Sequence, residues 1–175
     1  LFPTSARHER FDATTYPTCP GPLDLEKPDA FRAHGLYLKP GQGAVHTLYV
    51  VHHGTRESIE VFEVDTQAAL PALTWVGCAP ALSTLNFNSV VALPEGGFAA
   101  TSGRTGDVWQ YQTATGWRRV PGTEGTAPNG LEISKDGRWL YIAGWAEEKL
   151  TRLSRGQTRV QKDVVKLGFR PDNVR

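Results

Sequence analysis

The feature that most constrains the fold of this chain is an internal repeat. Asn88 and Asn129 lie 41 residues apart, and each precedes a stretch in which apolar and polar residues alternate. An acid, a glycine and an aromatic residue follow at equal steps, namely Glu95, Gly96 and Phe98 in the first copy and Asp136, Gly137 and Trp139 in the second. Alternation broken by a turn residue that tolerates positive φ is typical of a β-hairpin. Each copy is therefore expected to begin with two strands joined by an acid-glycine turn.

Two further strands are expected to complete each copy. We place them at residues 107–111 and 117–120 in the first copy, and at residues 149–154 and 159–167 in the second. Asn173 follows Asn129 by 44 residues and opens another copy, and an earlier copy begins near His34. The strands of that earlier copy are expected at residues 34–38, 47–52, 58–64 and 72–78. Four strands in each of several successive units of this length predict an all-β fold built from β-propeller blades.

The repeat also suggests the organisation of the chain. We expect blades at residues 34–80, 86–122 and 127–167, with the next one starting at residue 171. Residues 1–33 are rich in proline and show no alternation, so we interpret them as irregular chain or as the remnant of a preceding blade. About three blades do not close a ring that usually has about four to eight. Since the chain opens at Leu1 without Met, we interpret it as processed or partial, and expect a further segment or a second chain to complete the propeller.

Composition excludes several classes of function. Lys and Arg number 19 against 18 Asp and Glu, so the basic excess expected of a nucleic-acid-binding protein is missing. The apolar runs have the length of strands and fall short of a membrane span, and we expect a soluble protein. Cys19 and Cys78 could pair, but two cysteines form neither a disulfide-rich scaffold nor a zinc pattern. They leave the compartment of the protein open.

Polar residues recur in phase with the repeat and suggest a metal site. The first strands of propeller blades line the central channel, so Asn88, Asn129 and Asn173 are expected near one axis, together with Asp172. Each asparagine taken alone is also an ordinary turn residue, and that reading stays open. Amide and carboxylate oxygens are ligands that Ca²⁺ accepts, whereas zinc would favour His or Cys. We therefore predict a calcium site, to which a further carboxylate from outside the chain would contribute because Asp172 supplies one charge.

The order of these motifs resembles a known superfamily. Residues 34–173 carry, in order, HGLYL, LYVVHHG, FNSVVAL, PNGLEIS and PDNV. In this they are similar to the six-bladed, calcium-dependent propellers of the gluconolactonase, senescence marker protein and paraoxonase (arylesterase) superfamily. The resemblance implies that the calcium ligands are Asn88, Asn129, Asp172 and Asn173, and that the proton-transferring histidine pair is His34 and His53. The acidic ligand that the first blade of the family contributes has no counterpart here, since neither Glu9 nor Glu26 lies in a matching motif.

The resemblance implies hydrolysis of lactones or aryl esters, with the metal polarising the carbonyl oxygen of the small-molecule substrate. An imidazole can take the proton of the attacking water at neutral pH. We expect His34 to be this base and His53 to orient it through a hydrogen bond. Two other readings stay open: a propeller that binds a ligand or partner and holds calcium for stability, and a non-hydrolytic relative of the strictosidine synthase-like propellers. The histidines taken alone also allow a structural interpretation, in which His53 ends a strand before a turn and His34 lines the channel bonded to backbone.

Overall fold

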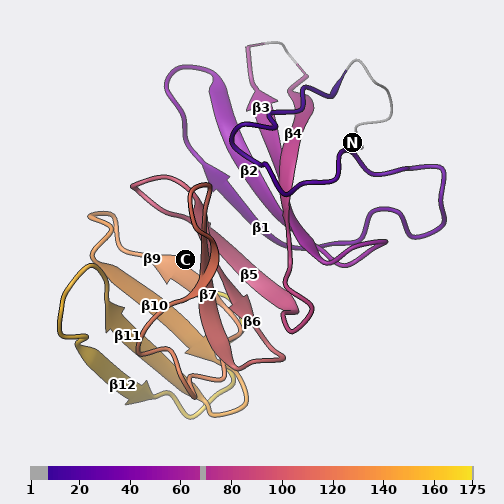
Figure 1. The fold of residues 1–175 in the computed structure, drawn as a ribbon. Coiled ribbons are helices and arrows are strands. Elements are labelled where there is room, and N and C mark those ends of the chain that lie inside the picture. Colours follow the sequence, from indigo (N-terminus) through magenta and orange to yellow (C-terminus); the bar gives the residue numbers. More distant parts are fainter. Residues whose placement is uncertain (1–7, 68–69, 175) are drawn as a thin grey trace. The chain divides into compact units, whose positions relative to one another are not determined.

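The structure is a computed structural model that describes residues 8–67 and 70–174 (Figure 1). In these residues twelve strands form three antiparallel sheets of four strands each, which confirms the all-β propeller fold predicted from the repeat. The chain divides into two compact units, Leu1–Ala81 with one sheet and Leu82–Arg175 with two. In the described part of the chain no helix is long and apolar enough to cross a membrane.

Each sheet is built from four consecutive strands. The sheet of the first unit has the order β1-β2-β3-β4 and consists of β1 (Ala33–Lys39), β2 (Val45–His52), β3 (Ser58–Asp65) and β4 (Ala72–Pro80). The second unit begins with a sheet of order β5-β6-β7-β8, made of β5 (Phe87–Ala92), β6 (Phe98–Ser102), β7 (Asp107–Gln112) and β8 (Gly116–Arg119). Its other sheet has the order β12-β11-β10-β9 and contains β9 (Leu131–Ile133), β10 (Trp139–Gly144), β11 (Lys149–Ser154) and β12 (Lys162–Lys166).

The acid-glycine turns form as the sequence predicts. Gly96 and Gly137 have φ angles of 97° and 72°, a region that glycine adopts without the clash of a Cβ atom. Oδ1 of Asp136 accepts hydrogen bonds from Ser134 Oγ at 2.6 Å and from the Arg138 backbone N–H at 3.1 Å. The hydrogen bond from Ser134, followed by those from Arg138, lowers the pKa of Asp136 to about 2. The carboxylate thus closes the turn between β9 and β10.

Aromatic rings fill one region of the sheet β5–β8. The ring centroids of Phe87 and Trp117 lie 4.6 Å apart, and those of Phe98 and Tyr111 lie 5.3 Å apart. Phe87, Phe98 and Tyr111 are at most 2% exposed. Because rings of this size bury large apolar areas, the cluster joins the first and last strands of the sheet into one core.

The segment before β1 covers the outer edge of the first sheet. The backbone N–H groups of Arg10 and Asp12 donate to the carbonyl oxygens of Trp75 and Val76 in β4, at 2.8 and 2.9 Å. The pairing is parallel at Glu9 and Trp75. These bonds occupy edge groups that would otherwise stay open to another chain.

A disulfide fastens the same segment to β4. Cys19 and Cys78 are bonded across 59 positions of the sequence. Close to the disulfide, the ring of Tyr16 lies directly over Gly77, where an added Cβ would come within 2.4 Å of the ring. Disulfide, ring and backbone bonds therefore hold residues 9–19 against one strand.

Replacing both cysteines, Cys19→Ala with Cys78→Ala, should destabilise the protein by about 2–4 kcal/mol, because the cross-link lowers the chain entropy of the unfolded state. Denaturant unfolding of the variant and the wild type measures the difference. Reducing agent should produce a similar loss in the wild type and none in the variant. Equal stabilities would mean that the backbone bonds to β4 suffice to hold the segment.

Candidate functional site

The strands β1 and β5 each carry an extra residue near their starts, and a similar irregularity lies directly before β9. Residues 34–35 lie opposite Val51, and residues 88–89 lie opposite Thr101. At the start of β9, the N–H of Asn129 donates to the carbonyl of Ala143 at 2.7 Å, and the N–H of Ala143 donates to the carbonyl of Gly130 at 2.9 Å, again placing two residues opposite one.

Such β-bulges interrupt strand pairing and redirect side chains, and they are common beside functional sites. The first position of the three bulges is held by His34, Asn88 and Asn129. The structure thus gives three of the predicted site residues a similar irregular backbone environment, within β1 and β5 for His34 and Asn88 and directly before β9 for Asn129.

Asn129 has a buried side-chain oxygen that lacks a partner. Its backbone is well bonded, since its carbonyl also accepts from Thr101 Oγ1 at 2.7 Å. Its Oδ1 is buried without a hydrogen-bond partner among the described residues. A buried acceptor left unsatisfied costs about 1–3 kcal/mol, so such an atom calls for an explanation. The interpretation of Asn129 as an ordinary turn residue explains its backbone hydrogen bonds, but it does not explain this unsatisfied side-chain oxygen.

Hydroxyl groups hold the starts of β5 and β9 together within the second unit. Thr101 Oγ1 accepts from the Ser89 N–H at 2.9 Å, and Ser89 Oγ accepts from the Leu131 N–H at 3.3 Å. Ser89 follows Asn88 directly, and Leu131 lies two residues after Asn129. The bonds therefore bring the backbones of Asn88 and Asn129 close together, and Asn88 is a half-buried residue.

The segment Asp172–Val174 passes directly against β9. A Cβ atom on Gly130 would lie 2.2 Å from the Asp172 carbonyl oxygen and 2.9 Å from the Asn173 Cα. The side chains of Asp172 and Asn173 belong to exposed residues. Three segments that are far apart in sequence and carry the predicted oxygen ligands thus meet within the second unit.

The donor chemistry of this region fits a hard cation. Its orphaned atom is an amide oxygen, and its one carboxylate belongs to Asp172, a set that suits Ca²⁺ better than a metal that favours nitrogen or sulfur. Within residues 8–67 and 70–174, no group of three or more His, Cys, Asp or Glu could hold a metal ion. A metal bound here would therefore depend on the asparagine oxygens.

The predicted histidine pair forms in the first unit. The ring centroids of His34 and His53 lie 5.2 Å apart with an interplanar angle of 70°, an edge-to-face arrangement. The backbone N–H of His53 donates to the Arg32 carbonyl at 3.0 Å, which extends the pairing of β1 with β2 to this residue. The two rings meet by packing, and the hydrogen bond that we expected between them is not found among the described residues.

Sequence reasoning missed a third member of this group. Nδ1 of His53 lies 2.8 Å from Oε2 of Glu57, and both side chains are 23% exposed. Glu57 follows His53 by four residues, across the turn between β2 and β3. A carboxylate shortly after a histidine in a tight turn is the signal that could have identified it.

The neighbouring His52 has a structural environment instead. Its side chain is fully buried, with Nε2 at 2.9 Å from the Ala30 carbonyl oxygen and Nδ1 at 2.8 Å from that of Arg56. Gly54 allows this approach, because a Cβ there would come within 2.6 Å of His52 Nε2 and 2.7 Å of the Ala30 carbonyl oxygen. Of the two adjacent histidines, His52 ties the segment before β1 to the sheet, and His53 is the accessible one.

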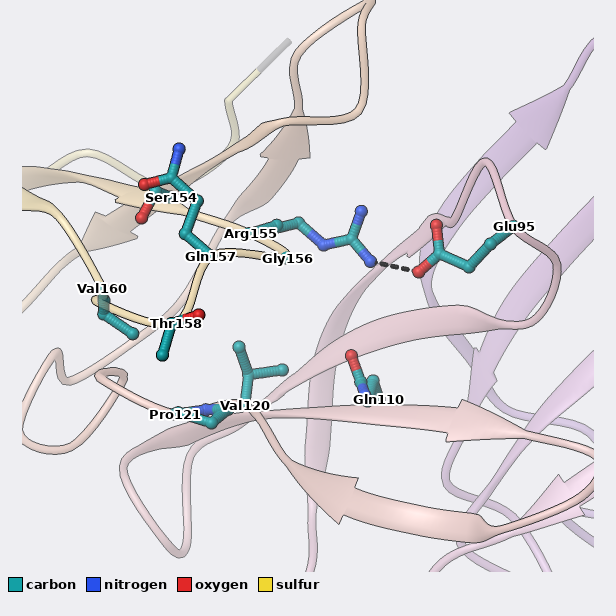
Figure 2. A pocket seen from close by; sticks show the side chains of 10 residues that line it. All are labelled: Glu95, Gln110, Val120, Pro121, Ser154, Arg155, Gly156, Gln157, Thr158 and Val160. Atoms are coloured by element: carbon teal, nitrogen blue, oxygen red, sulfur yellow. Dashed lines mark hydrogen bonds and ion pairs between the residues drawn. The ribbon is translucent and has the colours of Figure 1, made fainter.

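A cavity of about 390 Å³ lies elsewhere in the second unit (Figure 2). Figure 2 shows the side chains of Arg155 and Glu95 pointing toward one another in an ion pair at its rim. Glu95 follows the end of β5, whereas Asn88 lies near its start. The cavity is therefore at the opposite end of the strand from the oxygen-rich region.

Three sheets, each of four consecutive antiparallel strands, define a β-propeller fold. The structure is similar to virginiamycin B lyase from Staphylococcus aureus, with a TM-score of 0.52, 10% identity, and coverage of 81% of this chain and 44% of that chain. It is also similar to a streptogramin B lyase, with a TM-score of 0.51, 12% identity, and coverage of 81% and 43%. The chain thus spans less than half the length of these structures, and identities this low show the fold alone.

No protein-family model matches the chain, and no curated protein sequence matches it. The comparisons therefore support the β-propeller and leave the resemblance to the gluconolactonase and paraoxonase superfamily resting on its motifs.

Gly130→Ala should destabilise the protein by about 1–3 kcal/mol, the usual cost of forcing an atom into an occupied place. The new Cβ would collide with the backbone of Asp172, which cannot move aside as a flexible side chain would. Gly103→Ala is a matched control, because nothing lies within 4 Å of its added Cβ. Denaturant unfolding compares the two. If both variants lost the same stability, the result would contradict the close contact between Gly130 and residues 172–174.

Proposed function

We propose that the protein is a calcium-dependent hydrolase of lactones or aryl esters. The observation that carries the proposal is the buried, unpartnered Oδ1 of Asn129 at the point where three segments of the second unit meet. The residues that would hold the ion are Asn88, Asn129, Asp172 and Asn173. Bound calcium would polarise the carbonyl group of the substrate and stabilise the developing negative charge.

The first unit carries the groups that can handle protons. His34 lies in the β-bulge of β1, and its ring packs against that of His53. In the proposed reaction His34 takes the proton of the attacking water and later returns it to the leaving alcohol or phenol.

A propeller with non-hydrolytic chemistry is the second candidate. The two similar structures are both named as lyases, and a lyase breaks a bond by elimination without adding water. A histidine base and a bound cation serve both reactions, so the products distinguish them. Mass spectrometry of the product formed in ¹⁸O-labelled water gives the answer, because hydrolysis incorporates the label and elimination does not.

Asp172→Ala should weaken calcium binding more than Asn129→Ala, because it removes the one carboxylate of the set as well as an oxygen donor. Titration calorimetry on the full-length protein measures both affinities. Asp163→Ala, which removes an exposed carboxylate from β12, is the matched control and should bind calcium like the wild type. Unchanged binding in Asp172→Ala and Asn129→Ala would remove the calcium site from the proposal.

His34→Gln should lower the turnover of an aryl ester or lactone by about 10²–10⁴-fold, the contribution typical of a general base. Calcium affinity should stay near the wild-type value, since the imidazole does not belong to the proposed ligand set. His46→Gln is the control, because His46 lies at the far end of β2, where its Nδ1 accepts a hydrogen bond from the Gly41 N–H. Turnover of His34→Gln close to wild type between pH 6 and 9 would show that another group activates the water.

A further inference from the structure

The turn between β2 and β3 is tied down at both of its ends. The N–H of His53 donates to the Arg32 carbonyl at 3.0 Å, and the carbonyl of Glu57 accepts from the Ala81 N–H at 2.9 Å. Between these anchors the side chains of His53 and Glu57 meet at 2.8 Å, each about three-quarters buried. The contact thus joins two residues whose backbones are already fixed, so little chain entropy opposes it.

The nature of Glu57 decides which nitrogen of His53 carries a proton. An ionised carboxylate can only accept hydrogen bonds, so Nδ1 of His53 must be the donor. In the neutral ring the lone pair then belongs to Nε2. Glu57 therefore selects one tautomer of His53 and fixes the orientation of its ring.

The orientation of His53 matters because the ring of His34 packs on it. The centroid separation of 5.2 Å and the angle of 70° place the edge of one ring against the face of the other. A rotated His53 would no longer present the same surface to His34. We propose that Glu57 is the positioning residue of this pair, holding His53 so that His53 sets the place of the His34 imidazole; this inference rests on the proposed function, in which His34 is the base.

The neighbouring side chains of Arg56 and His52 are bound to other partners. The guanidinium of Arg56 is directed away from it, to Glu60 at 2.8 and 2.9 Å and to the Gly21 carbonyl at 2.7 Å. His52 lies against two backbone carbonyls instead of a carboxylate. The contact of His53 with Glu57 therefore lies beside the hydrogen bonds of Arg56 with Glu60 and is distinct from them.

The first test determines the tautomer of His53 directly. ¹⁵N NMR of the full-length wild-type protein should show His53 with its proton on Nδ1, and Glu57→Ala should convert it to a mixture of the two tautomers. Glu57→Asp keeps a carboxylate and should restore part of the wild-type signal. Glu63→Ala, which removes the partner of Arg10 from the same sheet, should leave the His53 signals unchanged. An unchanged His53 tautomer in Glu57→Ala would overturn the proposal whatever the activity.

The second test measures the steady-state kinetics of the proposed hydrolysis. Glu57→Ala should lower kcat by about 10- to 100-fold with a small change in KM, the loss expected when a reacting group is misplaced but the substrate still binds. Glu57→Asp should recover part of kcat, and Glu63→Ala should not lower it. If Glu57→Ala fails to fold, as judged by circular dichroism, Glu57→Gln supplies both readouts, since it keeps the volume and removes the charge.

The two readouts separate this inference from the proposed function. A changed tautomer with a wild-type kcat would overturn the positioning role while the hydrolase proposal stands. A wild-type protein that hydrolyses neither esters nor lactones would reject the proposed function and, with it, the catalytic purpose of the pair. The nitrogen spectrum would then decide by itself whether Glu57 holds His53.

Discussion

A β-bulge at the start of β1 and β5, and a similar irregularity directly before β9, is the constraint on which the candidate site depends. A regular strand sends successive side chains to alternate faces of its sheet, where neighbouring strands and sheets compete for the space. An extra residue breaks that alternation and gives one side chain a new direction. His34, Asn88 and Asn129 occupy this position in the three sheets. A similar backbone irregularity therefore recurs with the blades, at one candidate base and at two candidate oxygen ligands.

The bulges persist because polar groups nearby are satisfied. In the second unit, the hydroxyls of Ser89 and Thr101 bond to backbone groups of the neighbouring strand, and Gly130 lets residues 172–174 approach β9. In the first unit, His52 bonds to carbonyls outside its strand. Against this background two buried oxygens among the described residues are exceptions, Oδ1 of Asn129 and Oγ1 of Thr151 in β11. Local violations of otherwise consistent chemistry are expected at functional sites, where stability is exchanged for binding or catalysis.

The outer edges of the sheets are protected in different ways. In the first unit, residues 9–12 pair with β4, and the disulfide holds them there. In the second unit, all five residues of β12 are exposed, and Lys162 and Lys166 lie at its two ends. Covering a strand and placing lysines on it are both known means of preventing further strand pairing. The edge strand β4 is thus covered by a covalently fastened segment, whereas the edge strand β12 carries charge.

The sequence by itself determined the repeat, the four-stranded sheets and their acid-glycine turns, because alternation and turn chemistry are properties of residues that are neighbours in the chain. It also identified the asparagines, since they recur in phase with the strands, and the motifs that resemble a known superfamily pointed to the two histidines. Only the tertiary structure decided the rest: the pairing of residues 9–12 with β4, the disulfide that the two cysteines had left open, the β-bulges, the unpartnered oxygen of Asn129 and the contact of Glu57 with His53. These features depend on which distant segments meet and on which hydrogen bonds remain unsatisfied when they do, and no local pattern of residues records that.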